Sequence, residues 1–540
     1  MPYLPQPAKA VLMIEQTSQP APIAAADETP VSAEITVSNF GKWMALLAAL
    51  LGWLFDGLEM GLFPLVQGPA LADLNVPADQ VNHWIGIITA FFLVGAATGG
   101  VLFGWIGDRL GRVRAMMLSV LTYAIGSGLC GFAGNEWQVG ILRFLAALGM
   151  GGEWALGVAL INEIWPGRSR AFLAGLVGAA GNVGYLLIAV IGLGVLHQLQ
   201  SLRSAFEAIL PQSLVETLLR GQAWRLLMIV GAVPALLTFF IRAFVPESAR
   251  WERENRKGRT SHWLSRDLLG VLLGALGACA LIWLWAPKAP EWEMHLGLRI
   301  FNSGLCVFAI VSGYTYPVIR FLQRLHRTDP TQPTWRPMLR RMLLAACLSG
   351  VALIGTWGST QQAPKYATDV ARAAGQDTFA KEYTQISAAF GAIVGTILAA
   401  LMGDWLGRRL TYCLMCAGSL LIIPAFYLIP DRVDGLFLAM ACLLGAITAS
   451  FYGWLPLYLP ELFRTSMRAT GQGFGFNFGR VLAAIGVLQM GNLTELASRN
   501  EATARFGGLP AVCSTLSVVY IAGLLLIWLV PETRGKPLPE

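Results

Sequence analysis

Five ionisable side chains lie inside long apolar runs of this sequence, where a charge is costly. Asp56 and Glu59 occur in LFDGLEMG, Arg143 and Glu153 in ILRFLAALGMGGEW, and Arg480 in FGFNFGRVLA. A charge in such surroundings usually pairs with another charge or marks the path of an ion or solute. A carboxylate can also take up a proton, and an arginine can hold an anionic group. We therefore treat all five as candidates for binding a proton or a solute.

The composition indicates an integral membrane protein. The chain has 540 residues, of which 55% are hydrophobic and only 13% charged, and its mean hydropathy is +0.58. The basic residues behind the net charge of +7 lie in short gaps between apolar runs, which argues against a nucleic-acid partner. The eight cysteines fall inside apolar stretches, where a thiol is usually a small buried hydrophobe, so we predict no disulfide framework.

No motif in the sequence predicts an enzyme. The five histidines do not form an HExxH pattern, and the sequence contains neither a G-x-S-x-G elbow nor a Walker loop. We therefore assign no catalytic residue, no metal ligand and no cofactor.

The apolar runs are long enough to cross a bilayer as helices. A spanning helix needs about 20 mostly apolar residues, because the hydrocarbon core is about 30 Å thick and each residue rises about 1.5 Å. The predicted fold is an all-α polytopic membrane protein with about fourteen crossings. The runs are 43–66, 82–106, 113–133, 137–161, 171–196, 224–245, 268–286, 297–320, 339–362, 383–402, 410–430, 435–458, 470–491 and 509–530.

Lysine and arginine mark alternate gaps as cytoplasmic. The flanks 250–266 and 320–341 are both basic, whereas 67–81 contains no basic residue, so two extra helices are inserted between two six-helix halves. We predict a multi-pass protein of the plasma or inner membrane with both termini in the cytoplasm. The predicted segments are a disordered tail 1–42, a first bundle 43–245, a basic linker with two helices 246–338, a second bundle 339–530 and a tail 531–540.

Two motifs occur once in each half. GDRLGRV at 107–113 matches GDWLGRR at 403–409, and each lies between the second and third helix of its half. NEIWPGRSRA at 162–171 is echoed by PELFRTSMRA at 460–469, and each follows the fourth helix of its half. Repeats of this kind are typical of transporters built from two related halves.

These motifs and the duplicated six-helix plan resemble the major facilitator superfamily of secondary transporters. WRLLMIVGAVPALL from Trp224, PESARW from Pro246 and PETRGKPL from Pro531 further resemble the sugar porters and the related metabolite and aromatic-acid proton symporters. The resemblance implies that the motif residues form a breakable latch between the halves, the alternative being that they only set topology. The latch residues are Gly104, Asp108, Arg109, Arg112, Glu163, Arg170, Asp404, Arg408, Glu461 and Arg468.

The resemblance also implies a proton-coupling pair between the first and fourth helices. At about 1.5 Å per residue, Asp56 and Glu59 lie about 20 and 24 Å from the cytoplasmic end, within about a turn of Arg143. Protonation of either acid would release Arg143, although a static buried pair is the alternative. Glu153 either completes the proton relay or pairs with loop arginines.

The solute site is expected between the halves, where Asn182 and Tyr185 of the fifth helix face the equivalent helix of the second half. The predicted set is Asn182, Tyr185, Trp357, Gln361, Asn477 and Arg480, and Tyr452 and Trp454 are further lining candidates. The fifth helix lacks the glutamine of sugar porters, whereas DGLEMG and GGEW resemble the aromatic-acid, sialic-acid and metabolite symporters. A small organic anion such as a carboxylate is therefore the first choice of solute. A sugar, a uniporter and a transporter-like sensor are the alternatives, and a monomer is expected.

Overall fold

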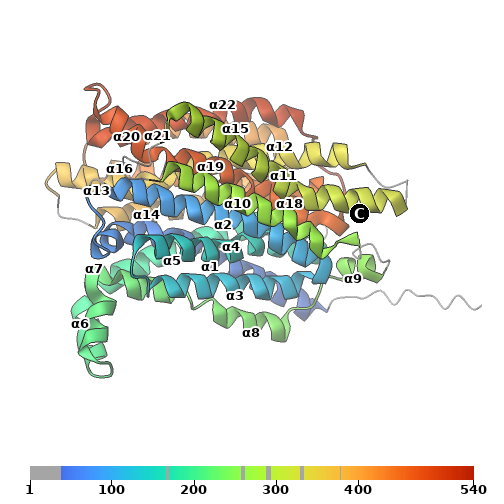
Figure 1. The fold of residues 1–540 in the computed structure, drawn as a ribbon, viewed down its shortest axis with the longest axis horizontal. Coiled ribbons are helices and arrows are strands. Elements are labelled where there is room, and N and C mark those ends of the chain that lie inside the picture. The colour runs from blue at the N-terminus through green and yellow to red at the C-terminus, as the bar shows by residue number, and fades with distance from the viewer. Residues whose placement is uncertain are drawn as a thin grey trace, which may run out of the picture. The chain divides into compact units, whose positions relative to one another are not determined.

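The computed structural model describes residues 38–78, 80–165, 170–256, 262–286, 294–328, 334–376 and 379–539, all of which belong to one contact-defined unit. Within these ranges the regular structure is entirely helical. Fourteen helical segments among the described residues are long and apolar enough to cross a membrane, which confirms the predicted number. Figure 1 shows how the helices are arranged. Most of the predicted tail 1–42 lies outside the described residues.

The first bundle begins at Asn39, four residues before the predicted start, and its α1 packs on α5 while α2 packs on α4. The sixth crossing is divided between α7 and α8. The helices are α1 (Asn39–Asp73), α2 (Val81–Leu110), α3 (Arg112–Cys130), α4 (Glu136–Ile164), α5 (Arg170–His197), α6 (Leu199–Glu207), α7 (Gln212–Val230) and α8 (Ala235–Phe244).

The second bundle repeats this plan with more interruptions. Its first, fourth, fifth and sixth crossings are divided into shorter helices, although Phe478, between α18 and α19, keeps helical φ and ψ. The helices are α12 (Trp335–Gly358), α13 (Ala363–Ala373), α14 (Ala380–Leu406), α15 (Arg408–Leu428), α16 (Gly435–Thr448), α17 (Phe451–Tyr458), α18 (Arg468–Asn477), α19 (Gly479–Leu488), α20 (Met490–Ser498), α21 (Leu509–Leu516) and α22 (Val519–Leu526), joined by short 3-10 turns.

Glycines bring equivalent helices into backbone contact in both bundles. A Cβ on Gly99 of α2 would lie 1.8 Å from the carbonyl oxygen of Leu148 in α4. A Cβ on Gly395 of α14 would lie 1.9 Å from the carbonyl oxygen of Ala446 in α16. Small residues allow such close approach between membrane helices, so the same packing solution occurs once in each half.

The two inserted helices are α10 (Leu268–Trp285) and α11 (Leu296–Thr328), close to the predicted runs, and the short α9 (Ala249–Arg256) precedes them. They pack on α2 of the first half and on α12, α18 and α19 of the second. The hydroxyls of Tyr314 and Thr98 are 2.6 Å apart across this contact. The inserted pair therefore lies along the seam between the two halves.

Besides the short α9, two helical segments were not predicted from the sequence. The first comprises α6 and the beginning of α7, which lie apart from the bundle in Figure 1, and the second is α13. Both α6 and α13 are short and amphipathic, and α13 forms the end of the candidate span Trp335–Ala373, beyond the predicted apolar run. The search for long apolar runs therefore passed over them.

Candidate functional site

The two GDxLGR loops lie at the same end of the bundle, which we call the motif end. In the first copy, the buried Arg112 donates to Asp108 at 2.6 Å, to Glu163 at 3.3 Å and to the carbonyl of Thr465 at 3.0 Å. Asp108 accepts from the backbone N–H and the hydroxyl of Thr470 at 2.8 and 2.5 Å. Because Thr465 and Thr470 belong to the second half, this copy joins the halves directly.

The second copy uses Arg408 and Glu461 as the equivalent pair, with the Arg408 Nη2 to Glu461 Oε1 distance at 2.7 Å. Arg170 of the first half also binds Glu461. Arg468 of the second half reaches back to Glu163 at 3.3 Å. The E-x6-R motifs therefore exchange ion pairs between the halves.

Three latch residues have other surroundings. Gly104 allows close contact, since a Cβ there would lie 2.9 Å from the Cα of Thr470. Arg109 lies over Trp105 and donates to Ser265 of the inserted linker at 2.7 Å. Asp404 has 55% of its side chain exposed and only a 3.4 Å contact with Arg408. Of the motif residues, Asp404 is the least engaged in joining the halves.

Two glutamates that we did not single out from the sequence support the latch. Glu247, in PESARW, accepts from the backbone N–H groups of Arg112 and Val113 at the start of α3. Glu532, in PETRGKPL, accepts from those of Arg408 and Arg409 at the start of α15. Each glutamate follows the sixth helix of its half at the same position, and this equivalence could have identified the two residues from the sequence. The segment predicted as a tail, 531–540, thus packs on the second bundle through its described part.

The two caps differ in their titration. Burial is the largest influence on Glu247, and it raises the pKa of that carboxyl despite the N–H donors and Arg112. At Glu532 burial acts in the same direction, but four backbone N–H donors outweigh it and lower the pKa. Glu247 is therefore the more easily protonated of the two caps.

The buried arginine of the fourth helix pairs with Glu59 and not with Asp56. Arg143 binds Glu59, which also accepts from Ser127 at 2.5 Å, and the guanidinium lies 4.3 Å from the ring centre of Phe92. All of these partners belong to the first half. The geometry favours a fixed ion pair at this position.

Asp56 and Glu153 form a second, less satisfied group. Their carboxyls lie within hydrogen-bonding reach of each other, and Arg480 is within electrostatic range of Asp56. Both oxygens of Glu153 and one of Asp56 are buried without a hydrogen-bond donor among the residues that the structure describes. Glu153 contacts no motif arginine and packs instead against Gly52 of α1.

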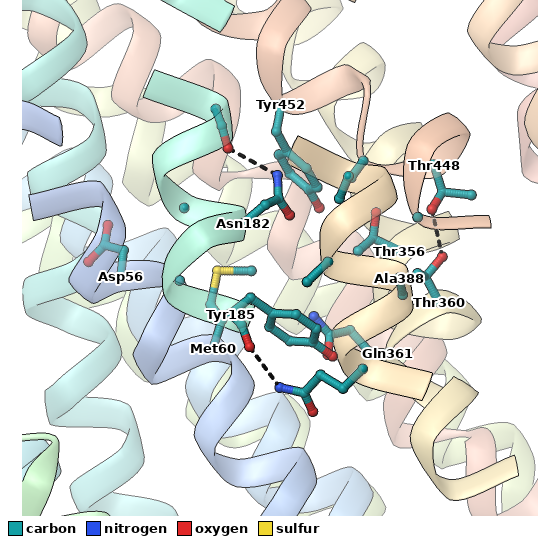
Figure 2. Close-up of a pocket in the computed structure, with 18 of the residues that line it drawn as sticks. Asp56, Met60, Asn182, Tyr185, Thr356, Thr360, Gln361, Ala388, Thr448 and Tyr452 are labelled. Carbon is teal, nitrogen blue, oxygen red and sulfur yellow. Dashed lines mark hydrogen bonds between the residues drawn. The ribbon is translucent and has the colours of Figure 1, made fainter. Parts of the chain in front are cut away.

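A narrow cavity of about 70 Å³ lies between the halves beside this carboxyl pair. Four of the predicted solute residues line it, namely Asn182, Tyr185, Gln361 and Arg480, and Figure 2 shows the first three with Asp56 at one side. Two other predicted residues do not line this cavity. Trp357 lines a smaller space beside Arg143, and Asn477 turns toward α4. The other polar or aromatic lining residues include Trp53, Trp154, Thr356, Thr360, Thr384, Gln385, Thr448, Tyr452 and Phe476.

Arg480 is the least satisfied cation at the cavity. It is 4% exposed, and its Nε and Nη1 have no hydrogen-bond partner within the described part of the chain. The guanidinium lies 5.3 Å from the ring centre of Phe476, which stacks on Trp154 at 3.9 Å. A buried guanidinium with free N–H groups beside stacked rings can bind a carboxylate attached to a planar apolar body.

Side chains of α14 close the cavity at the end opposite the motifs. Tyr185 donates to Gln361 at 3.1 Å, and Gln385 donates to the Tyr185 carbonyl at 3.0 Å (Figure 2). Lys381 donates to the carbonyl of Leu65 in α1 at 3.2 Å. Pro69 lies four residues after Leu65 and has no N–H, so this carbonyl lacks its helical donor and the lysine replaces it.

A wider vestibule lies beyond this closure. Its volume is about 960 Å³, and Lys365, Arg372 and Lys381 contribute cationic groups to its wall. The two halves therefore contact each other at both ends of the central cavity.

Comparison with known proteins agrees with this architecture. The family model of the sugar (and other) transporters matches residues 45–270 and 319–540. The chain belongs to this family. The unmatched segment 271–318 covers most of the inserted helix pair, so these helices are additional to the family fold.

Individual relatives of this transporter match along nearly its whole length. It is 25% identical to the cis,cis-muconate transport protein of Acinetobacter baylyi over 88% of this chain and 94% of that protein. It is 23% identical to the niacin transporter NiaP of the same species over 90% and 93%. The structure of the proton:xylose symporter XylE, from E. coli, superposes with a TM-score of 0.62 at 18% identity, covering 92% of this chain and 98% of XylE. The last match shows the major facilitator fold.

Proposed function

We propose that this transporter moves a small organic anion, most simply a carboxylate, together with a proton by alternating access. The observation that carries the proposal is Arg480, a buried guanidinium at the central cavity with two N–H-bearing nitrogens unpartnered among the described residues. Leaving such a group unsatisfied is costly, so a site of this kind is built for a ligand that completes it. An anionic solute would supply both the charge and the hydrogen-bond acceptors.

The lining of the cavity favours an anion over a sugar. A sugar presents many hydroxyl groups and needs many free hydrogen-bonding groups, yet Gln361 and Gln385 each commit one amide atom to a closing contact. The stacked Trp154 and Phe476 offer a flat apolar surface beside the cation. The relatives named for cis,cis-muconate and niacin, both planar carboxylic acids, support the same solute class.

Competition for Arg480 would couple the proton to the solute. When Asp56 is ionised it attracts Arg480, and when it is protonated the guanidinium is free for the solute. A proton on either carboxyl would also supply the hydrogen bond that the Asp56–Glu153 pair lacks. Proton and anion would then bind together, which is the requirement for symport. The Glu59–Arg143 pair, in contrast, would hold α1 against α4.

Movement would exchange the two sets of closing contacts. Opening at the motif end breaks the ion pairs of Glu163 and Glu461, whereas opening at the other end breaks the hydrogen bonds that Lys381 and Gln385 donate to backbone carbonyls. The basic loops support a cytoplasmic motif end, with both termini inside and the protein in the plasma or inner membrane. Because one chain contains both halves of the cavity, we propose that the monomer is active.

Uptake by the purified protein in liposomes tests this proposal. Labelled nicotinate, benzoate, cis,cis-muconate and xylose would be supplied with and without an inwardly directed proton gradient. The proposal predicts gradient-driven accumulation of at least one carboxylate and none of xylose. Xylose equilibration that ignores the gradient, without carboxylate uptake, would refute it.

A further inference from the structure

Helix α18 of the second half holds α4 of the first half through two side-chain amides. The Nε2 of Gln472 donates to the carbonyl of Ala155 at 2.5 Å, and the Nδ2 of Asn477 donates to the carbonyl of Gly151 at 2.8 Å. Both amide side chains are completely buried. No motif residue takes part in these contacts, which lie between the cavity and the motif latch.

The two accepting carbonyls flank Glu153 in α4. Gly151 and Ala155 are four residues apart and so share one face of the helix, whereas Glu153 lies about 200° around the axis from Gly151. Glu153 consequently faces α1, where a Cβ on Gly52 would lie 1.6 Å from its Oε1. Helix α4 is thus held between the carboxyl pair on one side and the amides on the other.

The packing leaves little freedom at this contact. A Cβ on Gly473 of α18 would lie 3.2 Å from the Cβ of Ala155 in α4. Phe476, next to Asn477, stacks on Trp154, next to Glu153. A shift of α4 at Glu153 is therefore transmitted to α18 through rigid contacts.

We propose that Gln472 and Asn477 are positioning residues that form an inner gate and tie its closure to the state of the Asp56–Glu153 pair. A proton gained or lost at that pair changes how α4 packs on α1. The hydrogen bonds that the Gln472 and Asn477 amides donate to the far face of α4 then hold or break. The inference rests on the proposed alternating-access transport. The charged and titratable groups around the carboxyl pair are Glu59, Tyr123 and Arg480.

The same amides are poised to release. The Oε1 of Gln472 and the Oδ1 of Asn477 are buried and have no donor in the described part of the chain. Water entering from the motif end would satisfy both oxygens as the gate opens. In the closed gate each amide therefore donates a hydrogen bond through its NH2 group, whereas its unpartnered oxygen favours opening.

Distance measurements between the halves test the gate without requiring a known solute. Spin labels at Arg114→Cys and Leu410→Cys would report opening at the motif end. Both positions are exposed, and each lies three residues after the second glycine of its GDxLGR loop. The labels would be placed in a variant whose native cysteines are replaced, reconstituted in nanodiscs. Distances would be recorded at pH 5.5 and pH 8.

Gln472→Met and Asn477→Leu remove the donors and keep similar volume. Each substitution should raise the ratio of open to closed molecules by about 2- to 13-fold, which corresponds to the net free energy of one hydrogen bond. Each should also make that ratio less dependent on pH. Asn162→Leu is the matched control, since the Asn162 amide is also buried and half-satisfied but donates at 2.8 Å to Val158 in its own helix. An unchanged distance distribution in both gate variants, or an equal change in the control, would overturn the inference.

Asn477→Asp gives an isosteric second test in case the apolar variants do not fold. A carboxyl can donate to the Gly151 carbonyl only when protonated, so closure of the gate should then require low pH. Identical distances at both pH values in this variant would contradict the inference. If the unmodified protein transports none of the carboxylates, the proposed function fails, while the distance test of the gate still stands.

Discussion

Replacing Arg480 by methionine should stabilise the empty protein and weaken its binding of carboxylates. The guanidinium is buried and only partly satisfied, so an apolar side chain of similar volume removes a desolvated charge. Replacing a whole buried ionic group by well-packed apolar side chains is often stabilising by about 1–4 kcal/mol, and Arg480, unlike Arg143, has no hydrogen-bonded carboxylate among the described residues that its removal would leave unpaired. Arg480→Met should therefore raise the melting temperature of the solute-free transporter.

The same substitution removes the proposed anchor for the solute. A hydrogen bond to a charged group contributes about 1.5–3 kcal/mol, and each 1.4 kcal/mol is tenfold in affinity. Arg480→Met should thus weaken binding of a carboxylate by roughly 10- to 150-fold. Arg480→Lys keeps the charge but loses the planar fork, so its defect should be smaller.

Arg143→Met is the matched comparison because Arg143 is equally buried but already paired with Glu59. Breaking that pair leaves an uncompensated carboxylate and should cost about 3–5 kcal/mol. Thermal unfolding in detergent, with and without nicotinate, benzoate or cis,cis-muconate, measures both effects. The reasoning is refuted if Arg480→Met lowers the melting temperature, or if a carboxylate that stabilises the unmodified protein stabilises this variant equally.

Six further substitutions test four other parts of the structure. Asp56→Asn should abolish proton-driven accumulation while solute exchange at equal pH persists, and loss of both activities together would contradict the coupling role. Lys381→Met should favour opening opposite the motifs by about 1.5–3 kcal/mol, measured as faster labelling of a cysteine placed in the vestibule. Pro69→Ala should reduce that effect, because it restores a helical N–H donor to the carbonyl of Leu65. Glu532→Gln should lower the free energy of unfolding by about 1 kcal/mol at pH 7, because the pKa of Glu532 is lowered and its ionised carboxylate stabilises the fold until the pH falls through that pKa. Glu247→Gln should cost less, because the pKa of Glu247 is raised. Melting curves from pH 7 downward test this, and a larger loss for Glu247→Gln than for Glu532→Gln would contradict it. Tyr314→Phe should cost about 1 kcal/mol by removing the bond to Thr98, and an unchanged melting temperature would mean that the inserted pair is not braced there.

Hydropathy and repeats were sufficient to predict the fold. The fourteen crossings, the inserted pair and the pairing of equivalent motifs follow from apolar length, loop charge and spacing, all of which are local in sequence. Amphipathic segments such as α6 and α13 were missed because their stability depends on packing rather than on apolar length.

The partners of buried charges could not be predicted from the sequence. Asp56 and Glu59 are one turn apart, and only the rotation of α1 decides which of them meets Arg143. The same limit applies to Asn477 and Arg480, which are close in sequence, although the first turns to α4 and the second lines the cavity.

Proton movement triggered by the solute tests the central claim most directly. Nicotinate, benzoate or cis,cis-muconate would be added outside liposomes that contain the transporter and a pH-sensitive dye, with no initial pH gradient. Liposomes with the Asp56→Asn variant are the first control. Protein-free liposomes are the second, and they report passive entry of the acid. The account predicts acidification of the lumen that accompanies carboxylate entry in the unmodified protein and falls to the protein-free level in the variant. Carboxylate entry through the unmodified protein with no proton movement beyond the protein-free level would contradict it.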